Sequence, residues 1–367
     1  MKKNKFLKVF SSAVALSVVL AGCSSSSNNS SSTKGAKPKV EFKTSVDNGG
    51  NLKEGQTLKY GILSSTPLTG LWNVVFSDQA TDQFVNQNVM GGTFPTDAEG
   101  RAKLDKEDAP VKMHLDREKN EVTLTIHKDL KWNNGENVTS KDIVATYELM
   151  GNPKFTTNVR YNDSFEFIEG MKEYHEGKAN TISGIKVKDD NTVVIKYSQL
   201  RPSIQWGEGM VTDFLNAKQV AEASKDFTKF AEAELNKKPL SYGPYYITKE
   251  VNGESVLAEA NPHYYQKDKV KTKKVEFKVV APAQASSVIK AGEVDIIESV
   301  TSGVYDSSKE LKNGTFLGES SRYMSYVGFK LGKFDKEKGE NVVDPNSKFA
   351  DKKLRQAFLY AVDRDQI

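Results

Sequence analysis

The sequence is almost devoid of cysteine and poor in histidine. Cys23 is the only cysteine among 367 residues, so no disulfide can form within one chain. The histidines are His114, His127, His175 and His263, and no two of them have the spacing of metal ligands. The fold must therefore rest on its core and its hydrogen bonds, and no metal or other cofactor is expected.

The sequence also lacks an apolar run long enough to cross a membrane, which takes about 18 residues. The apolar stretch from Val9 to Leu20 is only about a dozen residues long. Four lysines precede it and the small residues Ala21 and Gly22 follow it. A positive start, a short apolar segment and small residues are typical of an export signal, here residues 1–22.

Net charge is absent from the rest of the chain. The formal charge of +4 equals the four lysines of residues 1–22, which contain no acidic residue. Residues 23–367 therefore carry 48 basic and 48 acidic side chains, and this balance gives no support for a nucleic-acid partner.

The tetrad Leu20-Ala21-Gly22-Cys23 resembles the lipobox of bacterial lipoproteins. The resemblance implies cleavage before Cys23, acylation of its thiol, and anchoring at the extracytoplasmic face of the cell membrane. The alternative is ordinary signal cleavage beside an incidental free cysteine. Residues 23–50 are rich in serine, asparagine, threonine, lysine and glycine and predict a flexible tether.

Short apolar and polar alternations predict β-strands near residues 56–65, 121–132 and 275–280. Two hairpins are predicted, one over residues 181–199 and one over residues 243–265 with Asn252-Gly253 as a two-residue turn.

Helices are predicted between these strands. One follows the expected N-cap Thr139, residues 217–235 are rich in helix-forming residues, and another stops at Gly292 before a strand at Val294–Ile297. Helices and strands mix without a regular alternation, which indicates an α/β or α+β fold with more than one lobe.

The last predicted helix places five apolar residues on one face: Leu354, Ala357, Phe358, Ala361 and Val362. The sequence stops at Ile367 with no cap and no element against which to bury that face. We therefore expect the chain to be incomplete.

Four stretches occur in this order: LTIHKDLKWNNGENVTSKDIVATYELM (124–150), SYGPYYITKEVNGESVLAEANPHYY (241–265), IKAGEVDII (289–297) and FADKKLRQAFLYAVDRDQI (349–367). Together they resemble the peptide-binding family of extracytoplasmic solute-binding proteins, the receptors of oligopeptide ABC transporters. A further stretch, HEGKANTISGIKV, is similar to oligopeptide-binding lipoproteins of Gram-positive bacteria.

The resemblance implies a periplasmic-binding-protein-like α/β fold, with two lobes around a cleft and an extra subdomain. Most of the second lobe would be missing. It places the first lobe at 51–80 and 200–318, the subdomain at 81–199, and the start of the second lobe at 319–367. Because one lobe cannot close on a ligand, we expect these 367 residues alone to bind peptides poorly.

In such proteins a stretch after the first strand lines the cleft, which here corresponds to Phe76, Ser77, Asp78 and Gln79. The alternative is an ordinary surface turn. Arg160 and Tyr161 are candidates from the subdomain. Tyr323 and Tyr326 are candidates for the walls of side-chain pockets, although an aromatic strand is more often core. The acidic residue for the ligand amine would lie beyond Ile367.

Trp132 and Asp142 match the family well, and we interpret them as structural: the tryptophan packs the turn and the aspartate favours the start of the helix. Enzyme motifs are weak. HEGKA at residue 175 has Ala179 in place of a second histidine, and the S-x-x-K at residue 287 has no companion motif. GEG at 207–209 does not complete a dinucleotide-binding loop.

The sequence thus predicts a monomeric, lipid-anchored oligopeptide receptor that delivers peptides to an ABC permease and is not an enzyme. The alternative is a truncated surface interaction or signalling lipoprotein without transport function. Some members of the family bind nickel complexes or haem, so the resemblance leaves such ligands open.

Overall fold

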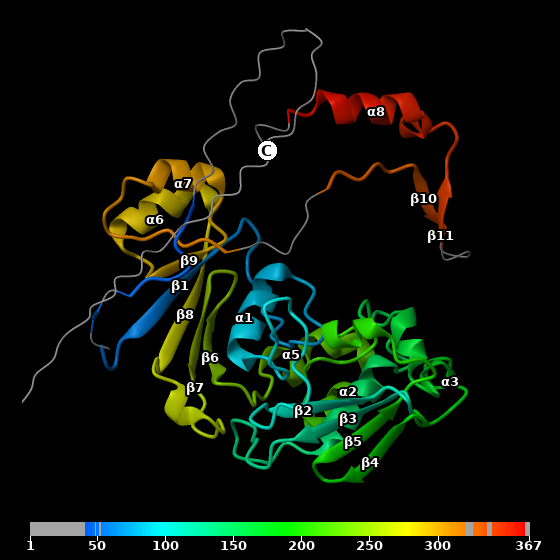
Figure 1. Cartoon of the computed structure of the whole chain (residues 1–367). Helices are drawn as coiled ribbons and strands as arrows, with labels where there is room; N and C mark the ends of the chain where they lie inside the picture. The colour runs from blue at the N-terminus through cyan, green and yellow to red at the C-terminus, as the bar shows by residue number, and fades with distance from the viewer. Residues whose placement is uncertain (1–40, 48, 51–52, 320–325, 336–339, 364–367) are drawn as a thin grey trace, which may run out of the picture. The chain divides into compact units, whose positions relative to one another are not determined.

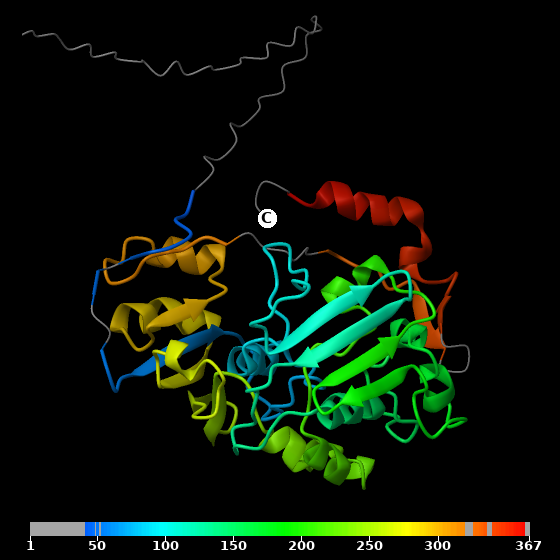
Figure 2. The same ribbon diagram turned by 60° about the horizontal axis from the view of Figure 1, so that its bottom comes forward.

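The computed structural model describes residues 41–47, 49–50, 53–319, 326–335 and 340–363. They belong to two compact units, one covering residues 44–317 and the other residues 318–367 together with the segment up to Lys43. Cys23 and Tyr323 lie outside the described residues. The larger unit contains two β-sheets and most of the helices, and Figures 1 and 2 show it from two directions.

The first sheet has five strands in the order β6-β7-β8-β1-β9. Strand β1 runs parallel to its two neighbours β8 and β9, whereas β6, β7 and β8 pair antiparallel. The strands are β1 (Thr57–Leu63), β6 (Tyr245–Val251), β7 (Ser255–Ala260), β8 (Lys274–Val280) and β9 (Ile296–Glu298).

Helices cover both faces of this sheet (Figure 1). Helix α1 (Ala80–Met90) packs against one face, where its Phe84 lies 5.2 Å from Tyr60 and 6.2 Å from Phe277 between ring centroids. Helices α6 (Ala285–Ala291) and α7 (Ser302–Ser308) pack on the other face, around Val280. The side chains of Val280 and Phe277 point to opposite faces of the sheet because successive side chains of a strand alternate.

The second sheet is antiparallel throughout, in the order β2-β3-β5-β4. Its apolar positions alternate as the sequence predicts, and Val122, Leu124 and Ile126 are all buried. Val187 is the exception at 53% exposed, because β4 is an edge strand. The strands are β2 (Val111–Asp116), β3 (Glu121–Ile126), β4 (Ile185–Asp189) and β5 (Thr192–Lys196).

Helix α2 (Ser140–Met150) packs its apolar face against this sheet and begins as the sequence predicts. Thr139 is the N-cap, and Thr139 and Asp142 form a capping box with reciprocal side-chain to backbone bonds. Two short elements follow it, the 3-10 helix η1 (Asp163–Phe167) and helix α3 (Met171–His175). They carry the chain to the edge strand β4.

Two local predictions are corrected. The helix-forming segment is broken into α4 (Ala217–Ala223), η3 (Phe227–Glu232) and α5 (Glu234–Lys237), because Asp226 caps a new turn by accepting a hydrogen bond from Thr228 N. The β6–β7 turn has three residues rather than two, since Val251 pairs with Ser255.

In the smaller unit, strands β10 (Gly332–Asp335) and β11 (Glu340–Val343) form a hairpin, and η6 (Lys348–Ala350) precedes helix α8 (Lys352–Ala361). The ring of Phe358 contacts Phe329 and Phe349 but remains 46% exposed. Val362, predicted on the helix face, is instead the extended C-cap residue. None of the helices in the described ranges is long and apolar enough to span a bilayer.

Candidate ligand-binding site

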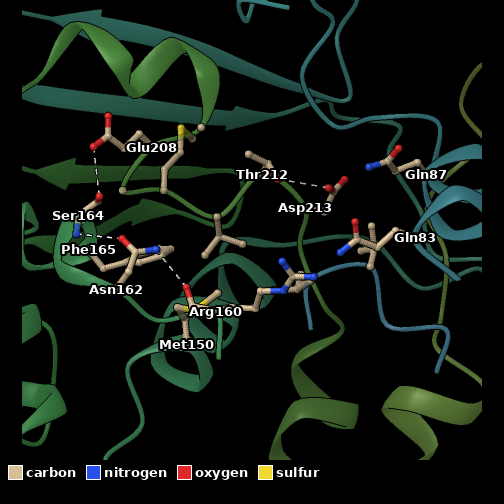
Figure 3. Close-up of a pocket in the computed structure, with 16 residues that line it drawn as sticks. Gln83, Gln87, Met150, Arg160, Asn162, Ser164, Phe165, Glu208, Thr212 and Asp213 are labelled. Atoms are coloured by element: carbon tan, nitrogen blue, oxygen red, sulfur yellow. Dashed lines mark hydrogen bonds between the residues drawn. The ribbon is translucent and has the colours of Figure 1, made fainter. Parts of the chain in front are cut away.

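A polar recess of about 300 Å³ lies in the larger unit (Figure 3). Its walls come from four parts of the chain: the segment Val74–Val75, helix α1, the segment from Met150 to Phe165, and residues 207–213. Its lining mixes polar and charged side chains with apolar ones such as Met150, Phe165 and Met210. The volume is at the lower end of the range for small-molecule pockets, so the recess suits one side chain or terminus of a larger ligand.

The segment 207–213 can form a wall because of its glycines. Gly207 ends the 3-10 helix η2 (Pro202–Trp206) with φ of 86°. Gly209 has φ of 70°, and a Cβ there would lie 2.5 Å from the carbonyl oxygen of Ser164. Any larger residue would push the wall away from η1, so this GEG motif serves backbone geometry.

Ser77 and Arg160 meet beside the recess, although 82 residues separate them. The carbonyl oxygen of Ser77 accepts hydrogen bonds from Arg160 Nη2 and, at 2.7 Å, from Gln83 Nε2. The side chains of Arg160 and Gln83 both line the recess. This carbonyl therefore ties the start of α1 to the segment that follows α2.

Unpartnered polar atoms gather around this contact. Among the described residues, four buried side-chain nitrogen or oxygen atoms have no hydrogen-bond partner: Asn73 Nδ2, Ser77 Oγ, Arg160 Nε and Tyr161 Oη. A buried polar group without a partner costs about 1–3 kcal/mol. Such groups in one region indicate a place where a ligand or ordered water supplies the missing partners.

The remaining predicted site residues have more ordinary surroundings. Phe76 packs in an aromatic cluster with Phe155 and Phe230, at centroid distances of 5.3 and 5.7 Å. Asp78 is exposed, and Gln79 is the N-cap of α1 without a capping side-chain bond.

The predicted tyrosines do not line the recess. The ring of Tyr161 stacks on His175 with centroids 3.8 Å apart, and burial raises the pKa of its hydroxyl to about 12, so the group stays a donor at neutral pH. Tyr326 belongs to the smaller unit and is 84% exposed.

Trp132 and Asp142 lie away from the recess, in the core. Asp142 is 4% exposed and accepts hydrogen bonds from Thr139 N at 2.7 Å, Ala217 N at 2.8 Å and Trp132 Nε1 at 3.4 Å. Burial raises the pKa of Asp142, while these hydrogen bonds oppose the rise. Both residues therefore hold the strand-to-helix turn together.

Glu208 and Asp213 are recess residues that the sequence did not single out. Glu208 accepts from Ser164 Oγ at 3.2 Å and pairs with Arg201 at 2.8 Å. The hydrogen bond from Ser203 lowers the pKa of Glu208, so it is a weak base and does not activate Ser164. The recess therefore offers hydrogen-bond donors, such as Arg160, and acceptors, such as Glu208 and Asp213, as a binding site for a polar ligand does.

Comparison with known proteins agrees with this description. Residues 113–367 match the family model described as bacterial extracellular solute-binding proteins, family 5 Middle. An oligopeptide-binding protein OppA of Lactococcus lactis subsp. lactis is 33% identical over 98% of this chain, and the match covers 60% of that protein. The chain thus spans about 60% of the length of the curated relatives it matches.

Solved structures give the same result. A lactococcal OppA complexed with an endogenous peptide in the closed conformation superposes with a TM-score of 0.75 at 29% identity, over 84% of this chain and 57% of that one. A Listeria monocytogenes OppA bound to peptide shares the fold, with a TM-score of 0.56 at 24% identity over 71% of this chain and 49% of that one. The predicted periplasmic-binding-protein-like α/β fold is confirmed, and the chain belongs to the bacterial extracellular solute-binding proteins of family 5.

Proposed function

We propose that the chain is part of an oligopeptide receptor that serves an ABC importer outside the cytoplasm. The observation that carries the proposal is the group of unpartnered buried polar atoms beside a polar recess, around the Ser77–Arg160 contact. A peptide main chain carries one donor and one acceptor at most residues and can supply such partners whatever its sequence. The similarity to a lactococcal OppA that holds a peptide supports the same ligand class.

The proposal is tested by calorimetry with a mixed pool of short peptides, together with mass spectrometry of peptides that copurify. We expect heat of binding and copurifying peptides for the natural protein at its full length. Absence of both would contradict the proposal. The 367-residue chain, run in parallel, should bind the same pool more weakly.

Replacing Arg160 with alanine should weaken peptide binding by about tenfold. The carbonyl oxygen of Ser77 would lose one of its two hydrogen-bond donors, and the recess would lose a charged donor. Calorimetry on the natural full-length protein measures the change. Arg117→Ala is the matched control, since Arg117 is exposed and does not line the recess. Equal affinities for the two variants would exclude a role for Arg160.

We further propose that Cys23 carries lipid and that the receptor works as a monomer with a membrane permease. The supporting observation is the sequence around Cys23, which resembles a lipobox. Cys23→Ser should move the protein from the membrane fraction to the medium, because stable anchoring takes two acyl chains. Fractionation followed by immunoblotting measures this. A variant that stays with the membrane would contradict acylation at Cys23.

A further inference from the structure

Asp213 is an acidic group of the recess with an unusual set of neighbours. Its Oδ1 accepts a hydrogen bond from Thr93 Oγ1 at 2.8 Å, and its Oδ2 lies 3.5 Å from Thr212 Oγ1. Thr93 Oγ1 also contacts the buried hydroxyl of Tyr242, which accepts from Phe214 N at 3.1 Å. Thr93 has one hydroxyl proton, and when it donates that proton's hydrogen bond to Asp213, the hydroxyl of Tyr242 must be the donor to Thr93. Each hydroxyl in this series then donates in the direction of the carboxylate.

The contacts of Asp213 contain no positive charge. None of the ion pairs among the described residues includes Asp213, whereas Glu208 in the same wall pairs with Arg201. Burial raises the pKa of Asp213 to about 6, against which the threonine hydrogen bonds act. At neutral pH the fold therefore holds a half-buried, mostly ionised carboxylate that forms no ion pair among the described residues.

Across the recess from Asp213 lie two glutamines of α1, with the Arg160 guanidinium beside Gln83, because both donate to the carbonyl oxygen of Ser77. Figure 3 shows Asp213 lying toward Gln83 and Gln87, which stand one turn apart on α1, while Glu208 and Ser164 lie at the other side. The amide oxygens of the glutamines can accept further hydrogen bonds from a cation. Arg160 is the only cationic residue of the lining, and one of its guanidinium nitrogens donates to Ser77.

We propose that Asp213 makes this end of the recess a subsite for a cationic group of the ligand. The inference rests on the proposed peptide-binding function and adds a preference to it. The group is an ammonium or guanidinium, supplied either by a basic side chain or by the terminal amine of the peptide. This group would donate hydrogen bonds to the carboxylate of Asp213 and to the amide oxygens of the two glutamines. Its positive charge would pair with the carboxylate.

The experiment measures calorimetric affinities of the natural full-length protein for three related probes. The first is an alanine-based peptide with one lysine, placed at each position in turn. The second has norleucine in place of the lysine, and the third is the first peptide with its terminal amine acetylated. A charge-assisted hydrogen bond predicts that removal of the bound cation lowers affinity about tenfold or more. Loss with norleucine that disappears in Asp213→Asn identifies a side chain at Asp213, and loss with acetylation that disappears in Asp213→Asn identifies the terminal amine there.

Asp213→Asn should lower the affinity for the cationic probe by the same factor and leave the affinity for the probe without the cation unchanged. Asp306→Asn is the control, because Asp306 is an exposed residue of α7 outside the recess. If peptides bind but Asp213→Asn lowers no affinity selectively, this inference is overturned and the proposed function stands. If no peptide binds the wild-type protein, the proposed function falls and the subsite with it.

A pH titration tests the wild-type protein even if the variant folds poorly. The titratable or charged groups around Asp213 are Arg160 and Glu208 in the recess lining and Tyr242 behind it, while α1 presents two neutral glutamines. The pKa of Glu208 is lowered and that of Tyr242 is raised, whereas that of Asp213 is raised to about 6. Affinity for the cationic probe should therefore fall as pH drops through about 6, whereas affinity for the neutral probe should not. Parallel curves for the two probes would overturn the subsite.

Discussion

Replacing Trp132 with alanine is expected to lower the free energy of unfolding by about 3–5 kcal/mol. The side chain is fully buried in the core of the second sheet, and its ring meets Tyr242 edge to face at 5.2 Å. The side chain lies beneath a tight turn that the main chain of the same residue closes: Trp132 N donates to Glu136 O, and Trp132 O accepts from Gly135 N. Alanine would leave a large cavity beneath that turn and remove a donor from Asp142.

Urea unfolding followed by circular dichroism measures the change. Trp132→Phe is the matched control, because it keeps most of the ring volume and loses only the Nε1 donor. We expect it to cost about 1–2 kcal/mol. Peptide affinity of the folded alanine variant should stay within about twofold of wild type, because Trp132 does not line the recess. A large loss of affinity with little loss of stability would contradict the structural role.

The features that the sequence predicted correctly are local. Alternating residues such as Val122 and Leu124 identify a strand because the period of a β-strand is two, and Thr139 identifies a helix start because an N-cap residue acts within the first turn. The exposed Val187 shows the limit of this reasoning. Its position has the right period, but whether that face is covered depends on β4 being an edge strand.

The recess depends on contacts between distant parts of the chain. Ser77 and Arg160 were named separately, from a resemblance and not from a pattern that joins them, and only the fold brings the carbonyl to the guanidinium. Asp213 carried no signal at all, because a carboxylate in a Thr-Asp pair is ordinary. Its distinguishing property is a place in the recess with threonine partners and no ion pair among the described residues, which is a property of three-dimensional packing.

Replacing Asp142 with alanine should be the second most damaging change, at about 2–4 kcal/mol. Three donors from different parts of the chain would lose their acceptor: the N-cap amide of Thr139, the first amide of α4 at Ala217, and the indole of Trp132. Because the site is 4% exposed, water cannot easily replace the carboxylate. The loss therefore exceeds that of a surface helix cap.

Asp142→Asn separates hydrogen bonding from charge. Its single oxygen can still serve Thr139, but its NH2 group would then face the amide of Ala217, so we expect about half the loss of the alanine variant. A double-mutant cycle with Trp132→Phe measures the coupling across the Trp132–Asp142 bond, which should be about 0.5–1.5 kcal/mol. Strict additivity would mean that this bond adds nothing to the turn.

The difference in unfolding free energy between wild type and Asp142→Ala depends on pH with a defined sign. Burial raises the pKa of Asp142 above its unfolded value, so the native state binds a proton at higher pH than the unfolded chain does. This residue's contribution to wild-type stability is therefore largest below the unfolded pKa and falls as pH rises through the folded one. The alanine variant lacks that dependence, so the difference in unfolding free energy between wild type and variant should widen as the pH is lowered. A gap that narrows on acidification would mean that the hydrogen bonds from Thr139 and Ala217 hold the pKa below its usual value, and that the carboxylate stabilises the turn as an anion.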